Sequence, residues 1–246
     1  MKNFYFVGCS MTYGQDLTID ERQTISFPAL ISKHHNATFV NEGRPGGTNQ
    51  RTVSKVLQNI NRYDHMYIQW IETDRFTMYN PKNWHEVNFG RLLGNTTYQN
   101  CDYYKVFGKY YYGYWSSMLF EFKAFLEQIV MLQSVLALNN QSYLFWCAGI
   151  PEWKILICDQ TEFIKNLSSK IDISKFDDDM ILQQYHEIQN LYKLIDFKKF
   201  ITPEEFDGAV VFDQFPLGPT KHSLKDGEQY IANQILNLER IHNESI

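Results

Sequence analysis

Short apolar runs alternate with segments of helical periodicity along this chain, and this alternation restricts the fold more than any other feature. Five runs have the length and composition of buried strands: residues 3–8, 37–41, 66–71, 142–147 and 209–212. Apolar residues at three- and four-residue steps predict helices over residues 27–34, 48–61, 115–138, 179–195 and 224–238. Strands alternating with helices predict right-handed crossovers and a central, mainly parallel sheet, covered on both faces in an α/β sandwich of three layers.

Two segments interrupt this alternation. Residues 73–114 are rich in Tyr, Asn and Gly, and residues 152–208 show one helical segment only, so both are interpreted as irregular insertions. The acidic run at 177–179 is interpreted as the start of that helix rather than as a metal site. At 246 residues, without a repeat or a linker, the chain is expected to form a single domain over residues 1–246.

Charge and apolar content exclude several classes of function. The chain has 23 basic and 28 acidic residues, a net charge of -5, without a basic stripe, so nucleic acid is not an expected partner. The apolar run near Met1 is too short for a signal peptide, and no stretch is long enough to span a bilayer. We expect a soluble cytoplasmic protein, or a virion protein if a phage encodes it. The four cysteines lack Cys-x-x-Cys spacing, which predicts reduced thiols and no metal.

A serine between glycines follows the first predicted strand. The run over residues 8–14 is GCSMTYG, with Ser10 two residues beyond the strand. Glycines here allow a sharp turn and bring backbone amides close to a substrate oxygen. The alternative is that Ser10 is a helix cap or a turn residue.

Two further motifs lie where strands end. The run over residues 40–49 is VNEGRPGGTN, a glycine-rich entry to a helix. Such an entry offers unhindered amides to a developing oxyanion, or alternatively binds a phosphate. His222 lies in a loop just before the last predicted helix, and a histidine whose pKa is near 6.5 can take and return a proton. The alternative for His222 is an ordinary surface residue.

Together and in this order, the three motifs resemble the blocks of SGNH (GDSL-like) hydrolases. The sequence Gly-Cys-Ser-x-Thr-x-Gly resembles a variant common in bacteria and tailed phages. The resemblance implies an SGNH-hydrolase-like, flavodoxin-like sandwich in which Ser10 is the nucleophile and His222 the general base. It also implies an oxyanion hole made by the backbone amides of Ser10 and Gly46, which follows Asn41 at the family's five-residue spacing. No metal or organic cofactor is expected.

The chain departs from the family pattern at two positions. Pro219 stands where the family has the aspartate that orients the histidine, so Asp213, Asp226 or a backbone carbonyl is expected to hold His222. The family's asparagine after the third strand is absent. The candidates to replace it in the oxyanion hole are Asn49, Gln69 and Arg75, and Arg75 alternatively pairs with an acidic neighbour.

Three functions remain open from the sequence. The first is a serine esterase acting on a small ester, with an acetylated carbohydrate as one substrate, because the aromatic residues over 98–115 could stack on sugar rings or instead form core or interface. The second is a non-catalytic binding or structural module, as a homo-oligomer or in a larger assembly such as a phage particle. The third, nucleotide binding through residues 43–49, is weaker because the Lys and Ser/Thr of a Walker motif are absent.

Overall fold

The computed structural model describes all residues except 74, 80–85, 90–117, 170–176 and 245–246. Its centre is a five-stranded sheet in the order β2-β1-β3-β6-β7, in which neighbouring strands are parallel. These strands are β1 (Lys2–Val7), β2 (Ala37–Asn41), β3 (His65–Trp70), β6 (Tyr143–Cys147) and β7 (Phe200–Ile201). A separate antiparallel pair follows β3 and consists of β4 (Phe76–Tyr79) and β5 (Glu86–Phe89).

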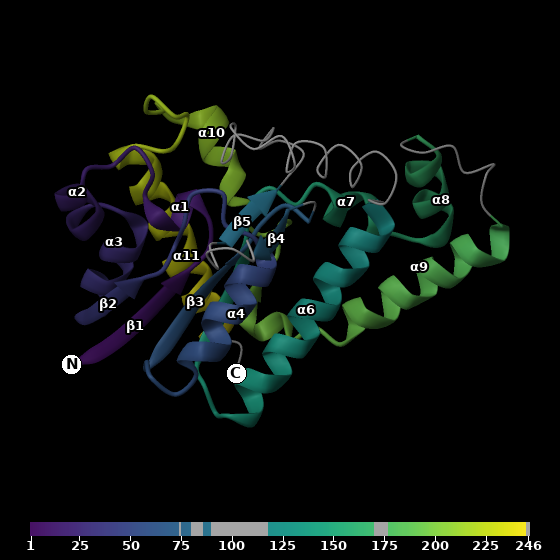
Figure 1. Cartoon of the computed structure of the whole chain (residues 1–246), viewed down its shortest axis with the longest axis horizontal. Helices are drawn as coiled ribbons and strands as arrows, with labels where there is room; N and C mark the ends of the chain where they lie inside the picture. The colour runs from purple at the N-terminus through teal and green to yellow at the C-terminus, as the bar shows by residue number, and fades with distance from the viewer. Residues whose placement is uncertain (74, 80–85, 90–117, 170–176, 245–246) are drawn as a thin grey trace.

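Helices cover both faces of the sheet (Figure 1). One face carries α4 (Asn49–Asn59), α6 (Met118–Leu138), α7 (Glu152–Leu156), α8 (Gln160–Ser168) and α9 (Asp178–Lys193). The other face carries α3 (Phe27–His34), α10 (Val211–Gln214) and α11 (Lys225–Glu244). The short helices α1 (Ser10–Tyr13) and α2 (Ile19–Thr24) lie in the connection between β1 and α3. The predicted three-layer α/β/α sandwich with a parallel sheet is therefore confirmed.

The side chains of β1 show how the sheet divides the interior into two layers. Tyr5 and Val7 belong to the core between the sheet and α4 and α6, whereas Phe4 and Phe6 belong to the core on the opposite face. All four side chains are buried. Because helices cover both faces, the buried part of β1 is apolar on both sides, and this is why the first strand was predictable from its sequence.

The predicted strand over residues 209–212 is wrong. These residues form a 3₁₀ turn, η5 (Gly208–Val210), and α10, and the fifth strand of the sheet is β7 instead. The Asp207 side chain begins the turn by accepting a hydrogen bond from the Ala209 amide at 2.9 Å. A short apolar run does not by itself distinguish a strand from a buried helix. Here the side chain of Asp207 caps the first turn, and the apolar run that follows is helical.

The two segments interpreted as irregular contain regular structure. Residues 152–208 include α7, α8, α9 and β7, and the first two of these helices are too short to produce a clear periodicity. The predicted helix start at the acidic run is confirmed, because the Asp177 side chain accepts a hydrogen bond from the Asp179 amide at 2.8 Å. Of residues 73–114, the structure describes 73, 75, 76–79 and 86–89, and the last two ranges form the antiparallel pair of β4 and β5. The aromatic cluster over 98–115 lies outside the described residues.

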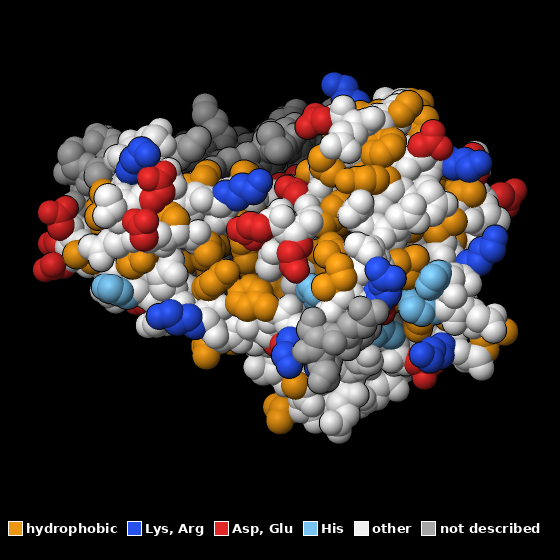
Figure 2. All heavy atoms as spheres, turned by 180° about the vertical axis from the view of Figure 1, so that it is seen from behind, with side chains coloured by type: hydrophobic (Ala, Val, Ile, Leu, Met, Phe, Trp, Pro, Cys, Tyr) orange, Lys and Arg blue, Asp and Glu red, His pale blue; other side chains and the backbone are white. Residues whose placement is uncertain are grey.

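The described surface gives two observations on possible partners. Among the residues that the structure covers, no helix combines the length and the apolar character needed to cross a membrane. On the face shown in Figure 2, acidic and basic side chains of the described residues are interspersed rather than gathered by sign.

Candidate active site

Ser10 lies at the carboxyl edge of the sheet, in the turn that follows β1. It is the first residue of α1, a single helical turn that ends at Gly14, whose φ is 70°. A Cβ at Gly8 would lie 2.4 Å from Gln69 Oε1 and 2.5 Å from Thr12 Oγ1. Only glycine fits at position 8, so the sharp turn that presents Ser10 depends on it.

The side chain of Gln69 holds this turn from the neighbouring strand β3. Gln69 is fully buried, and its Oε1 accepts hydrogen bonds from the Cys9 amide at 3.1 Å and from the Thr12 hydroxyl at 2.6 Å. Its Nε2 donates to Met11 Sδ at 3.6 Å. From the sequence, Gln69 was a candidate oxyanion donor. The structure instead commits this amide to fixing the backbone around Ser10.

His222 reaches Ser10 from the opposite end of the chain. It lies in the loop between α10 and α11, and its Nε2 is 2.7 Å from Ser10 Oγ. In Figure 1 the turn at α1 and the loop that precedes α11 lie at the same end of the sheet. Two side chains that are 212 residues apart in the sequence are thus in hydrogen-bond contact.

The hydrogen-bond partner of His222 Nδ1 determines which ring nitrogen carries the proton. Nδ1 lies 2.9 Å from the backbone carbonyl oxygen of Thr220. Because a carbonyl oxygen can only accept, Nδ1 donates to it, and Nε2 is left to accept from the Ser10 hydroxyl. This is the tautomer that a general base for Ser10 requires.

Of the three expected partners for His222, the backbone carbonyl is the one that contacts the ring. Asp213 lies in α10 and Asp226 in the first turn of α11. Within the described parts of the chain, neither aspartate forms a hydrogen bond to His222.

Asp16, which the sequence motifs did not indicate, holds the backbone of the histidine loop. Its carboxylate accepts hydrogen bonds from the Thr220 amide at 3.0 Å, from the Thr220 hydroxyl at 2.7 Å and from the His222 amide at 3.0 Å. Gly218 permits this approach, since a Cβ there would lie 2.5 Å from Asp16 Cβ. A lone glycine in a loop is too common a signal to reveal a partner 202 positions away in the sequence before the fold is known.

The surroundings of His222 favour its neutral form. Burial lowers the pKa of the imidazole, and the nearby Arg75 guanidinium lowers it further, against opposing effects of the Thr220 carbonyl and the Asp16 carboxylate. The net pKa of His222 lies below its ordinary value of 6.5. Arg75 itself is ion-paired with Glu72 at 2.8 Å, in agreement with the expected acidic neighbour. At neutral pH the ring is therefore unprotonated and able to accept a proton.

The glycine-rich segment after β2 packs directly against the turn that carries Ser10. Asn41 Nδ2 donates to the Thr12 carbonyl at 2.6 Å, and the Arg44 amide donates to the Gly8 carbonyl at 3.1 Å. Gly46 has a φ of 68°, in the left-handed region that favours glycine. The backbone of Gly46 therefore belongs to a segment held beside Ser10.

Asn49, the other residue expected at the oxyanion hole, uses its side chain elsewhere. Its Nδ2 donates to the Ile71 carbonyl at 3.0 Å, and its Oδ1 accepts from the Ile71 amide at 3.1 Å. Asn49 is buried, and this two-point contact joins the first turn of α4 to the residue that follows β3. Its observed role is to brace the edge of the sheet.

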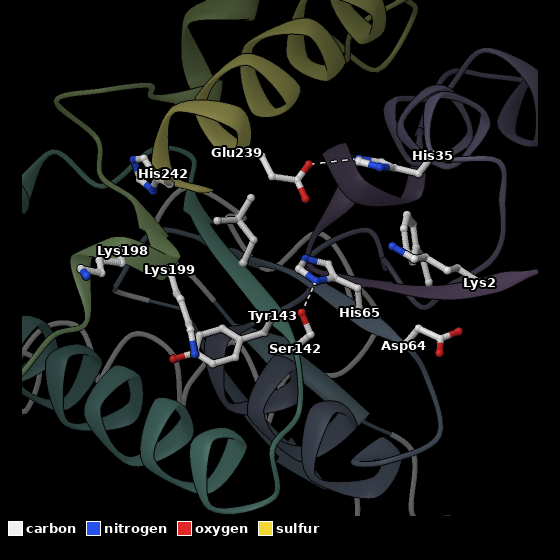
Figure 3. A pocket seen from close by; sticks show the side chains of 12 residues that line it. Lys2, His35, Asp64, His65, Ser142, Tyr143, Lys198, Lys199, Glu239 and His242 are labelled. Carbon is white, nitrogen blue, oxygen red and sulfur yellow. Dashed lines mark hydrogen bonds and ion pairs between the residues drawn. The ribbon is translucent and has the colours of Figure 1, made fainter. Parts of the chain in front are cut away.

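A cavity of about 330 Å³ lies at the opposite, amino edge of the sheet. Figure 3 shows His35 facing Glu239 and His65 facing Ser142 there, with nitrogen–oxygen distances of 3.1 Å and 2.7 Å. Neither Ser10 nor His222 lines this cavity. Its position at the starts of β1, β3 and β6 separates it from the Ser10–His222 pair.

Glu228 is a buried carboxyl group that supports the histidine loop from α11. Its Oε2 accepts from the Phe27 amide at 2.8 Å, and its Oε1 accepts from the hydroxyl of Ser223, the residue after His222. Burial raises the pKa of Glu228 to about 7, although both hydrogen bonds lower it. The loop that carries His222 is thereby tied to the first turn of α3.

We expect Glu228→Gln to remove a pH dependence of stability. The carboxyl pKa is about 7 in the folded protein against 4.5 for the unperturbed group, so the free energy of unfolding should fall as pH rises between these values. The loss amounts to about 3 kcal/mol at most. Glutamine can accept from Phe27 and donate to Ser223 without ionising. Urea denaturation of the wild type and of Glu228→Gln at pH 5 and pH 8 measures the free energy of unfolding. An equal decrease from pH 5 to pH 8 in the two proteins would contradict this prediction.

Comparisons with known proteins give structural likeness alone. No family model and no curated protein matches the chain. An α/β hydrolase from the metagenome of Lake Arreo, Spain, is 11% identical with a TM-score of 0.47, over 97% of this chain and 94% of that one. A variant of an acetylxylan esterase from Geobacillus stearothermophilus is 12% identical with a TM-score of 0.46, over 97% and 94%. A member of the lipolytic protein G-D-S-L family from Veillonella parvula is 12% identical with a TM-score of 0.43, over 96% of each chain.

Of these three proteins, the one from Veillonella parvula carries the G-D-S-L family name, and the other two are named as an α/β hydrolase and an acetylxylan esterase. Identities of 11–12% and TM-scores below 0.5 do not transfer a substrate or a catalytic residue to this chain. The chemistry of the site follows from its own residues. The buried Ser10 hydroxyl is hydrogen-bonded to the neutral His222 ring, whose tautomer is set by the Thr220 carbonyl.

Proposed function

We propose that the chain is a serine esterase of SGNH type that hydrolyses a small ester through Ser10 and His222. The observation that carries this proposal is the 2.7 Å contact between Ser10 Oγ and His222 Nε2, with the Nδ1 proton held by the Thr220 carbonyl. A hydroxyl is a weak nucleophile, and an adjacent base in this tautomer is what activates it.

The reaction follows from this geometry in two steps. Ser10 Oγ attacks the ester carbonyl carbon while its proton passes to His222 Nε2, and the amides of Ser10 and Gly46 stabilise the oxyanion. The tetrahedral intermediate then expels the alkoxide, which leaves as an alcohol after taking the proton from His222. In the second step His222 accepts a proton from water, the resulting hydroxide attacks the acyl-Ser10 ester, and the released Ser10 oxygen recovers the proton. These steps use no cofactor.

A small acyl group suits the surroundings of the nucleophile. Ser10 is only 8% exposed, and the glycine-rich segment packs beside it. We therefore propose an acetyl or similarly short acyl ester, with an O-acetyl group on a carbohydrate as one substrate class. The aromatic cluster over 98–115 motivates the carbohydrate part of this proposal from the sequence.

Covalent labelling tests the proposal without knowledge of the natural substrate. A fluorophosphonate probe should form one adduct per chain at Ser10, detected by intact mass and peptide mass spectrometry. His222→Gln should label far more slowly while retaining the wild-type melting temperature. Absence of labelling in the folded wild-type protein would contradict the esterase and favour the non-catalytic binding or structural module.

We also expect hydrolysis to persist into mildly acidic solution. The base must be neutral to act, and the pKa of His222 lies below 6.5 because the ring is buried. The value of kcat/KM should therefore be constant around pH 7 and should fall only as the pH drops through this lowered pKa. A rate profile between pH 4 and pH 8 with an acetyl aryl ester measures the midpoint. A midpoint above 6.5 would be inconsistent with the described surroundings of His222.

A further inference from the structure

The turn that follows Ser10 is fastened to the loop that carries His222. Besides the three hydrogen bonds that Asp16 accepts, Gln15 Nε2 donates to the Thr220 hydroxyl at 3.0 Å. Asp16 adopts a φ of 70° and Lys221 a φ of 62°, values that non-glycine residues rarely adopt. The two loops therefore fit each other closely, and the fit places a carboxylate under the backbone of His222.

The Asp16 carboxylate supplies a negative charge near the imidazole ring, which the hydrogen bond from Nδ1 to the Thr220 carbonyl does not supply. The ring donates from Nδ1 to a neutral carbonyl, which orients it but carries no negative charge. During the reaction the ring becomes a cation, and a nearby negative charge stabilises that cation. Among the described charged groups that act on His222, Asp16 stabilises the protonated ring, and Arg75 disfavours it.

Asp16 is ionised when the site operates. Partial burial acts to raise the pKa of its carboxyl group, but the hydrogen bonds from Thr220 and His222 outweigh this effect and lower the pKa below 3.8. The carboxylate is therefore charged at neutral pH.

We propose that Asp16 is the positioning acid of this site, holding the histidine loop through Thr220 and supplying the negative charge that stabilises the His222 imidazolium. The proposal rests on the proposed esterase function for its role in turnover. It assigns to the turn after the nucleophile a part that SGNH-like motifs assign to a residue three positions before the histidine, where this chain has Pro219. The nucleophile and the support for its base thus come from one short stretch of the chain, residues 10–16.

The direct test is a pH titration of the His222 ring by NMR, which needs no substrate. The ring signal is assigned by its absence from the spectrum of His222→Gln. In Asp16→Asn and Asp16→Ala the midpoint should fall by about one unit relative to the wild type. The matched control is Asp20→Asn, an exposed aspartate in the first turn of α2, which should leave the midpoint unchanged.

Kinetics supply the second measurement. If the chain is an esterase, kcat of Asp16→Asn should fall by about tenfold to a hundredfold with little change in KM, and the acidic limb of the rate profile should move to lower pH. A chain without esterase activity would refute the proposed function, yet the NMR titration would still decide the role of Asp16.

Two outcomes would overturn the inference. One is an unchanged His222 midpoint in folded Asp16→Asn and Asp16→Ala. The other is the failure of both variants to fold. Both should fold, because Thr220 is exposed and water can replace the contacts that Asp16 makes with it. If neither folded, the role of Asp16 would be to stabilise the fold rather than to support His222.

Discussion

Replacing Ser10 by alanine should lower kcat for a short-chain aryl ester by about 10⁴- to 10⁶-fold. The hydroxyl that attacks the carbonyl is lost, and His222 Nε2, which lies 2.7 Å from that hydroxyl in the wild type, is left with only water to activate. The methyl side chain of alanine fits the space of the serine, so the fold should be retained. Steady-state kinetics of the purified variant measure the effect.

The matched control for this variant is Ser134→Ala. Ser134 is an exposed serine on α6 whose hydroxyl donates to the Val130 carbonyl of its own helix at 2.7 Å. This variant should hydrolyse the ester at the wild-type rate. If Ser10→Ala and Ser134→Ala were equally active, Ser10 would have no part in the reaction.

Gln69→Leu should destabilise the folded protein strongly. The Cys9 amide and the Thr12 hydroxyl both donate to Gln69 Oε1 in a fully buried position, and leucine offers neither of them an acceptor. Two buried donors without partners cost about 2–4 kcal/mol in the free energy of unfolding. Because the same bonds shape the turn at Ser10, activity should fall as well. Urea denaturation measures the first effect and ester hydrolysis the second.

Gln58→Leu controls for the change of residue type. Gln58 is exposed on α4, and its side chain donates to Ser54 at 3.3 Å. The free energy of unfolding of this variant should stay within about 0.5 kcal/mol of the wild type. A Gln69→Leu protein as stable as Gln58→Leu would show that water or a shifted backbone replaces the lost acceptor.

The parts of the fold that were predictable from sequence are those with a strong local signal. The strands at 3–8, 37–41, 66–71 and 142–147 and the helix over 115–138 correspond to β1, β2, β3, β6 and α6. The fifth strand was assigned to the wrong residues. β7 has two residues and so leaves no pattern, whereas residues 209–212 are apolar but become helical beyond the Asp207 cap.

The candidate site divides in a similar way. Ser10 could be placed at the carboxyl edge from sequence, because it follows a strand of a parallel sheet. His222 was placed there for its position before the last predicted helix and after a strand predicted over 209–212, and that strand is η5 and α10 in the structure. Sequence could not predict the roles of Gln69, Asn49 and Asp16. They depend on which polar groups meet across loops, and side-chain contacts such as Asp16 with Thr220 are set by the packed structure rather than by local spacing.

The distance in sequence between the two reacting side chains has a consequence for the life of the protein. During synthesis, residues 1–221 can emerge and begin to fold before His222 is made, so under the proposed mechanism Ser10 would stay unreactive until the segment that carries His222 docks. Proteolytic removal of α11 together with the loop before it would likewise leave Ser10 without its general base, while β1 and the turn after it would stay in the remaining fragment. Under the proposed mechanism, Ser10 would thus become reactive only after the loop that carries His222 has docked beside it.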